Sequence, residues 1–149
     1  MKPTLSLSLQ NASAHTGLPT RVELRRWARA ALLYDVVAAL RLVDEEEGMQ
    51  LNQDYRGKPQ ATNVLTFAYG AEEEGGPLSG DILLCVPVVE REATEQRVAR
   101  EAHYAHLTVH GMLHLQGYDH EAEDEAVAME AVESFIMMRL GFPDPYQDG

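Results

Sequence analysis

Residues 109–120 read VHGMLHLQGYDH and contain three of the six histidines in the chain. His110 and His114 lie four residues apart in a segment with helical character, so both imidazoles face one side of the helix. Gly117 permits a sharp reversal of the chain, and His120 follows three residues later, from where it can return toward the other two. Three neutral nitrogen donors with one open coordination position are typical of a catalytic zinc site. The stretch therefore predicts a metal site on His110, His114 and His120.

The offsets of these residues match a known protease motif. Metzincin proteases carry H-E-x-x-H-x-x-G-x-x-H, and the three histidines and the glycine stand at the same positions here. Gly111 occupies the position of the glutamate that acts as the general base in those enzymes. Glycine cannot act as a base, and we expect its small size to leave room beside the metal for a bulky substrate group. Peptide hydrolysis by the usual route is therefore disfavoured, and a metallopeptidase is kept only as an alternative.

Other residues near the motif have less specific roles. His103 and His106 precede the triad on the same helical face, and we interpret them as hydrogen-bonding residues of the core or its rim. Two roles fit Asp119: orienting a ligand imidazole, or capping the following helix. Cys85 is the only cysteine, which excludes a closed thiolate zinc site. Its place in the apolar run ILLCV predicts a buried structural thiol.

Length and charge narrow the class of protein. The chain has 149 residues, of which 45% are hydrophobic and 24% charged, and we predict one domain over residues 1–149. It has no apolar run of the roughly 18 residues that cross a membrane, and its first residues lack the apolar core of a signal peptide. We therefore expect a cytoplasmic protein without a membrane partner. The net charge of −12 argues against non-specific coating of RNA or DNA.

The basic residues are concentrated near the N-terminus. Residues 1–41 carry six Lys and Arg against two acids, whereas residues 42–149 carry six against 22 acids. Arg21, Arg25 and Arg29 recur at every fourth position of a predicted helix. A solvated helix face and a surface for an anionic partner both explain this pattern.

Alternation and turn residues predict the elements of the fold. A helix opens at Pro19-Thr20, where Thr20 and Glu23 have capping-box spacing. The other expected elements are strands at 4–9, 36–43, 64–69 and 81–86, a short helix from Asp44 to about Asp54, loops at 55–63 and 71–80, and helical segments at 88–116 and 121–140. The 88–116 segment fits either one long helix or two helices joined near 96–100.

These elements predict an α+β fold. Strand, helix and strand within the first 45 residues favour a parallel βαβ unit. The loop at 71–80 is long for a tight hairpin and too short for a helical crossover, so we expect its two strands to be antiparallel. The expected architecture is a four-stranded mixed sheet with one antiparallel strand, about five helices mostly on one side, and a zincin-like metal helix.

The stretch HGMLHLQGYDH resembles the signature of the YbeY family, bacterial metal-dependent endoribonucleases of ribosomal RNA maturation. Three more segments are similar to the family in the expected order: LNQDYRGKPQATNVLTF (51–67), GDILLCVPVVEREA (80–93) and LGFPDPY (140–146). The first 50 residues match only in their strand–helix–strand pattern. Thr66 and Ala68 stand where family members often carry Ser and Pro, which affects only our expectation of substrate fit.

The resemblance implies one divalent metal ion on the three histidines, Zn²⁺ first, with Ni²⁺ or another transition metal also suitable. It also implies a functional arginine at Arg56, and we take Arg56 and His114 as the catalytic residues. A guanidinium binds phosphate oxygens bidentately, which suits a phosphodiester substrate. A loop salt bridge, with Asp54 as the partner, is the alternative role for Arg56.

The function implied is that of a single-strand-specific endoribonuclease. It would act in 16S rRNA maturation, ribosome biogenesis and rRNA quality control. The expected partners are single-stranded or ribosomal RNA, the small ribosomal subunit and assembly proteins, with no role on DNA. Besides the metallopeptidase, the alternative is a non-catalytic ribosome-assembly factor with a structural metal. The open three-histidine geometry argues against a structural metal.

Overall fold

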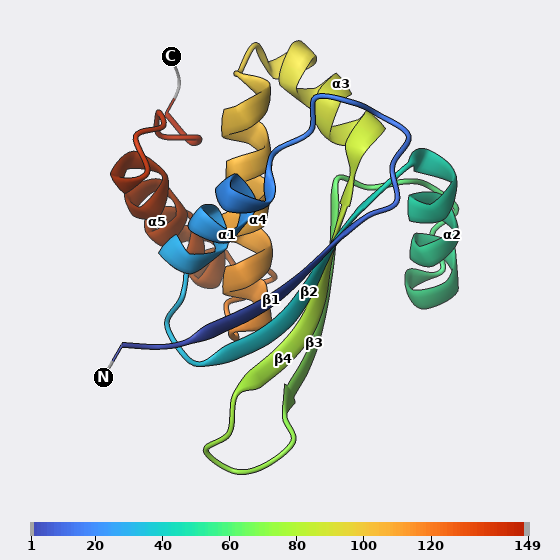
Figure 1. Ribbon diagram of the computed structural model, residues 1–149. Coiled ribbons are helices and arrows are strands. Elements are labelled where there is room, and N and C mark those ends of the chain that lie inside the picture. The colour runs from blue at the N-terminus through green and yellow to red at the C-terminus, as the bar shows by residue number, and fades with distance from the viewer. Residues whose placement is uncertain (1, 148–149) are drawn as a thin grey trace.

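The computed structural model describes residues 2–147, and this range forms one mixed sheet with helices on both faces. The strands are β1 (Leu5–Asn11), β2 (Val36–Val43), β3 (Val64–Ala71) and β4 (Leu78–Cys85). The helices are α1 (Arg21–Ala30), α2 (Glu45–Arg56), α3 (Val86–Gln96), α4 (Arg100–Leu115) and α5 (Glu123–Arg139). The sheet order is β1-β2-β4-β3, with β3 antiparallel to β4 and the other pairs parallel. The predicted α+β class is confirmed (Figure 1).

The helices cover the two faces of the sheet unequally. α1, α4 and α5 lie on one side and α2 on the other (Figure 1). The larger apolar core lies between the sheet and the three helices, around Trp27, Ile82 and Met112. A smaller cluster on the α2 side includes Leu65 and Cys85. Cys85 is buried as predicted, and burial raises the pKa of its thiol, so it remains protonated and unreactive.

The N-terminal unit follows the sequence prediction closely. β1 and β2 are parallel and joined through α1. The Thr20 hydroxyl accepts a hydrogen bond from the Glu23 N–H at 3.1 Å, and the Glu23 carboxylate accepts one from the Thr20 N–H at 2.9 Å. This capping box satisfies two N–H groups that a helix start leaves unpaired.

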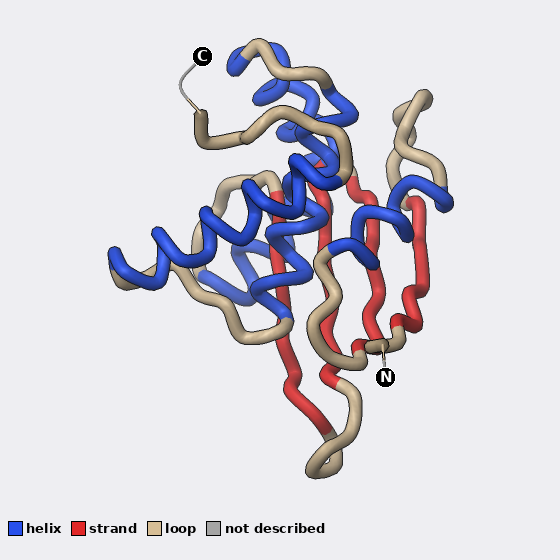
Figure 2. Tube along the Cα trace, turned by 90° about the vertical axis from the view of Figure 1, so that its left-hand side faces the viewer, coloured by secondary structure: helices blue, strands red, loops and turns tan. Residues whose placement is uncertain are grey.

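The segment at 88–116 takes one of its two expected forms, two helices joined near 96–100, because Arg97 adopts a left-handed φ of 57° and ends α3. Other boundaries differ from the prediction. α2 continues to Arg56 instead of ending near Asp54, because Gly57 takes a φ of 68° and forms the left-handed end one residue later. β4 begins at Leu78, so the β3–β4 loop is shorter than expected, and it projects beyond the sheet (Figure 2). Within residues 2–147, every helix is too short or too polar to cross a bilayer.

Two glycines allow α4 to pack directly on the sheet. A Cβ on Gly111 would lie 2.9 Å from Cγ2 of Ile82, closer than carbon atoms approach without displacement. A Cβ on Gly80 would lie 2.7 Å from Cγ of Leu115, at the end of α4. Our expectation that Gly111 leaves room for substrate is therefore wrong, because Ile82 of β4 fills that space. Gly111 instead fixes how close the histidine-bearing turns of α4 come to the sheet.

Gly111→Ala is expected to destabilise the protein, although alanine is a better helix former than glycine by about 1 kcal/mol. The added methyl group meets the fully buried Ile82, and overpacking of this kind costs about 1–3 kcal/mol. Urea unfolding of the metal-free proteins measures the difference. The matched control is the same change in an Ile82→Ala background, where the methyl group has room and is neutral or stabilising. Equal destabilisation in both backgrounds would contradict the packing explanation.

Candidate metal centre and substrate cleft

The three predicted ligands come together at the end of α4. His110 and His114 project from its last two turns, and His120 follows the reversal at Gly117, which adopts a φ of 109°. One ligand atom from each histidine lies within 4.8 Å of those of the other two. Nε2 of His114 is 2.9 Å from Nδ1 of His120. The arrangement can therefore bind a metal ion.

The reversal that returns His120 is built from backbone hydrogen bonds. The N–H of Tyr118 donates to the carbonyl of Leu113 at 3.0 Å, and the N–H of Gly117 donates to that of His114 at 3.0 Å. This pair of bonds satisfies carbonyls that the end of a helix leaves unpaired. It needs a residue that tolerates positive φ, which explains the glycine between the second and third histidines.

The protonation state of His114 suits a metal. Burial lowers the pKa of His114 below its ordinary value, and positive charge on His110 and His120 lowers it further. The neutral imidazole, which is the form that binds metals, is therefore favoured at His114. The zincin-like character of the metal helix stays a prediction from the histidine offsets.

A buried carboxylate that the sequence reasoning missed supports the triad. Glu133 of α5 is 1% exposed, and its Oε2 accepts a hydrogen bond from Nδ1 of His110 at 3.0 Å. Its Oε1 lies 2.6 Å from Nε2 of His106 and accepts a bond from the Tyr146 hydroxyl at 2.6 Å. Burial alone would raise the pKa of Glu133, but the bonds from His106, His110 and Tyr146 lower it to about 2. The ionised carboxylate leaves Nε2 of His110 as the nitrogen available to a metal.

A signal for Glu133 was present in the sequence. It lies among the buried positions of α5, four residues after Met129 and three before Ile136. A charged residue on the apolar face of a helix needs a partner, because an unpaired buried charge is strongly unfavourable. The sequence alone does not say that this partner is the histidine helix, since that depends on how α5 packs against α4.

The two earlier histidines are hydrogen-bonded, as predicted. His103 is buried, with Nε2 2.9 Å from Oε1 of Glu92, and the same oxygen accepts a bond from Asn63 at 3.0 Å. His106 takes part in the Glu133 network. Asp119 fills neither of its two expected roles: its carboxylate accepts a bond from the backbone N–H of His120 at 2.7 Å, and it does not cap α5.

A cavity of about 410 Å³ joins the triad to Arg56. Arg56 is the last residue of α2, on the opposite side of the sheet from α4, and it reaches the cavity beside the start of β3. The other cavity residues come from β3 and its approach, and from the turn after α4: Thr62, Asn63, Val64, Thr66, Ala68, Asp119 and Glu121. The predicted salt-bridge alternative for Arg56 does not occur, because Asp54 accepts a bond from Gln50, and Arg56 forms no ion pair with any residue in 2–147. Thr66 and Ala68, where the chain departs from the family pattern, both face this cavity.

A second hollow of about 820 Å³ continues from this cavity and shares Asn63, Val64 and His110 with it. It runs past His106 and Tyr146 toward the end of α3. The two hollows therefore adjoin each other at His110 and at the start of β3.

Comparison with known proteins assigns the family. The model of the family described as Endoribonuclease YbeY matches residues 19–141. The chain belongs to the YbeY family. A relative from Methylobacillus flagellatus, named Endoribonuclease YbeY, is 59% identical over 144 residues, covering 97% of this chain and 95% of the relative. One of the same name from Paraburkholderia phymatum is 54% identical over 150 residues, covering 97% of each chain.

A solved structure supports the fold of this YbeY family member. The solution structure of TM1509 from Thermotoga maritima is 25% identical in sequence and has a TM-score of 0.56. The match covers 95% of this chain and 99% of that chain. The shared architecture thus extends over nearly the whole of both proteins.

Glu133→Gln is expected to change how stability depends on pH. Because the pKa of Glu133 in the folded protein, about 2, lies below the ordinary 4.5, its ionised form stabilises the fold above pH 4.5. This contribution, about 3 kcal/mol, is lost as the pH falls through about 2. Urea unfolding of the metal-free proteins at pH 6 and pH 3 measures the effect. Between these two pH values, the free energy of unfolding should fall less in the variant than in the wild type.

The same variant is expected to bind Zn²⁺ about 10–100-fold more weakly, because the amide no longer fixes His110 by a charged hydrogen bond. Competition with a chromogenic chelator measures this affinity. Glu130→Gln, an exposed change on the same helix, is the matched control. Identical zinc affinity in the Glu133 and Glu130 variants would show that the buried carboxylate has no influence on the triad.

Proposed function

We propose that this chain is a metal-dependent endoribonuclease that hydrolyses phosphodiester bonds in single-stranded RNA. The observation that carries the proposal is the convergence of three histidines and Arg56 on one cavity. A metal-binding triad opposite a guanidinium that has no ion-pair partner within residues 2–147 suits a substrate whose reacting group is an anion. The names of the relatives, Endoribonuclease YbeY, support the same activity.

The proposed cofactor is one divalent ion held by His110, His114 and His120. Such an ion polarises a phosphoryl oxygen and lowers the pKa of a coordinated water to about 7. Zn²⁺ is our first choice, and Ni²⁺ or another transition metal also accepts imidazole ligands. Three neutral donors without a thiolate favour an open catalytic site over a structural one. Glu133 holds the ring of His110 in place from behind.

Arg56 and His114 are the proposed catalytic residues. The Arg56 guanidinium binds the phosphate oxygens, and its positive charge stabilises the charge that they gain in the transition state. His114 would hold the ion together with His110 and His120, and the bound ion would supply Lewis-acid chemistry. Asp119 accepts a hydrogen bond from the backbone N–H of His120 and has no proposed part in the chemistry.

Neither alternative has a supporting observation. The position of a protease glutamate is Gly111, which is enclosed against Ile82 and does not line the cavity. A structural metal does not explain why the triad faces an open cavity together with Arg56.

We place the activity in 16S rRNA maturation, ribosome biogenesis and rRNA quality control in the cytoplasm, carried out by a single domain over residues 1–149. The net charge of −12 makes affinity for bare RNA weak. Docking on the small ribosomal subunit or its assembly proteins then supplies a high local concentration of RNA. DNA and membranes have no part in this proposal.

RNA cleavage by site variants tests the proposed activity. Arg56→Glu and His114→Ala are both expected to reduce kcat/KM for single-stranded RNA by about 100-fold or more, since each removes charge that stabilises the transition state. Metal content separates the two: the Arg56 variant retains the ion and the His114 variant loses it. Cleavage of a labelled oligonucleotide and metal analysis of the same samples are the measurements.

Arg91→Glu is the matched control, because Arg91 is exposed and its nearest carboxylate oxygen, on Glu45, is 4.0 Å away. It makes the same change of charge outside the cavity and should retain activity. If Arg56→Glu cleaves RNA as well as Arg91→Glu does, Arg56 has no catalytic role.

Zinc binding is expected to stabilise the folded chain. At about 100 times the dissociation constant, free Zn²⁺ adds about 2.7 kcal/mol to the free energy of unfolding. Thermal unfolding with and without the ion measures this gain, which His120→Ala should abolish. A metal-free protein that stays folded but cleaves no RNA supports a catalytic metal. Cleavage at full rate after complete metal removal would contradict the proposal.

The docking surface is proposed to be the basic side of α1. Arg25 donates a hydrogen bond to the carbonyl of Leu7 at 3.1 Å and tethers α1 to β1, so Arg21 and Arg29 are the more exposed members of the predicted row. Arg21→Glu with Arg29→Glu should weaken co-sedimentation with small ribosomal subunits without changing cleavage of a short oligonucleotide. Unchanged co-sedimentation would exclude this surface.

A further inference from the structure

We infer that a stacking surface for RNA bases lies on the α2 side of β3, formed by the rings of Tyr55, Phe67 and Tyr69. The inference rests on the proposed function, because it extends the path of the RNA beyond the metal cavity. Nothing in the metal centre requires these three rings. Their position and exposure are what need an explanation.

β3 is an edge strand whose side chains divide between two surfaces. Val64, Thr66 and Ala68 line the cavity of the histidines. The residues between them face the other way, and Leu65 and Phe67 belong to the cluster on the α2 side. A single strand thus separates the metal cavity from a second surface that lies directly behind it.

Tyr69 lies on that second surface, at a β-bulge. Ala68 pairs with Gly80 and Gly70 pairs with Ser79, so Tyr69 is an extra residue without a partner on β4. The Tyr69 hydroxyl donates a hydrogen bond to Asp81 at 2.8 Å, and Asp81 pairs with Phe67 in the sheet. Bulges often redirect a side chain beside an active site.

The rings are held in position and remain open to solvent. Tyr55 and Tyr69 are 68% and 64% exposed. The rings of Tyr55 and Phe67 make an edge-to-face contact with centroids 5.1 Å apart. Asp81 restrains the ring of Tyr69 through its hydroxyl. Fixed, exposed aromatic faces stack on nucleobases of any sequence and lose little entropy when they do so.

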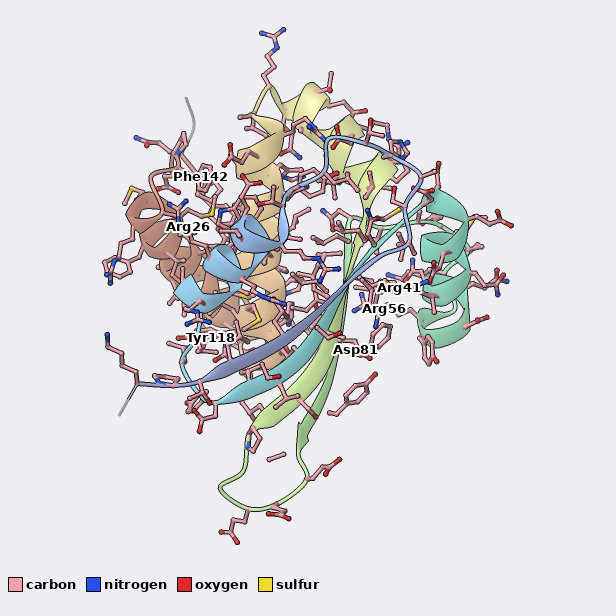
Figure 3. The ribbon with its side chains drawn as sticks, viewed as in Figure 1. Arg26, Arg41, Arg56, Asp81, Tyr118 and Phe142 are labelled. Carbon is pink, nitrogen blue, oxygen red and sulfur yellow. The ribbon has the colours of Figure 1, made fainter. Side chains whose placement is uncertain are left out.

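The cations that follow Tyr55 favour RNA as the partner. Tyr55 and Arg56 are consecutive at the end of α2, and exposed Lys58 follows the glycine that ends the helix. Figure 3 shows Arg56 and Asp81 on the side of the sheet where α2 packs, yet Arg56 also lines the metal cavity. An RNA strand with one phosphate at Arg56 would therefore pass beside Tyr55, whose ring contacts Phe67 on β3.

Steady-state cleavage of a short, unstructured RNA by the metal-loaded protein tests this inference. Tyr55→Ala and Tyr69→Ala should each raise KM about tenfold, because loss of one stacked base is of this order, while kcat changes less than twofold. Tyr55→Phe keeps the ring and should retain the wild-type KM. Tyr34→Ala, at a tyrosine that is 57% exposed and outside the cavity, is the matched control.

Fluorescence anisotropy of the same RNA with metal-free protein gives a readout that does not depend on cleavage. The alanine variants should bind about tenfold more weakly, and an RNA with abasic sites should remove the difference between wild type and Tyr69→Ala. If both alanine variants keep the wild-type affinity and KM, the inference of a stacking surface is wrong, even if the protein cleaves RNA. Failure of metal-loaded wild type to cleave RNA would overturn the proposed function, while the anisotropy result would still decide the stacking surface.

Discussion

The close approach of α4 to the sheet is the constraint on which the site depends. Gly111 and Gly80 leave no side chain between the helix and β4, so Ile82 and Leu115 fill the contact themselves. This spacing sets the distance between the histidine turns and the strand opposite them, and therefore the width of the cavity. The glycine that takes the place of a protease glutamate thus has a packing reason. It does not widen the site, and it is not among the residues that line the cavity.

Glu133 adds a second constraint, because it joins α5 to the metal helix through a buried charge. An ionised carboxylate is stable in a protein interior only when several donors surround it, and here two histidines and a tyrosine do so. The network links the orientation of His110 to the packing of α5 and of the segment that carries Tyr146. Metal binding and the stability of the helical side of the fold are therefore coupled through one group.

β3 connects the two surfaces that an RNA strand would meet. β3 is an edge strand of the sheet. Every second side chain of β3 faces the histidines, and the side chains between them face α2. Arg56 is at the end of α2 and also lines the metal cavity beside the start of β3, so it is close to both surfaces. The strongly acidic composition fits such a design, because a few placed cations and rings can select the substrate where a uniformly basic surface would bind RNA without discrimination.

The sequence by itself determined the elements, the fold class and the identity of the clustered histidines. Local signals carried these predictions: the i, i+4 spacing of His110 and His114, the glycine at the reversal, and the capping box at Thr20. Such features depend only on residues close together in the chain, so they can be recognised in the sequence. Arg56 was predicted only through the resemblance of residues 51–67 to a known family, because no pattern among its neighbours in the sequence marks it as functional.

Only the tertiary structure decided the rest. The role of Gly111 depends on Ile82 of β4, and that of Glu133 depends on how α5 packs against α4. The end of α2 and the joint between α3 and α4 depended on residues that take positive φ, Gly57 and Arg97, and an arginine gives no sequence signal for that conformation. The sequence determined which chemical groups this protein carries. Packing between distant elements decided which of these groups meet, because contacts between residues far apart in the chain produce no recognisable pattern in the sequence.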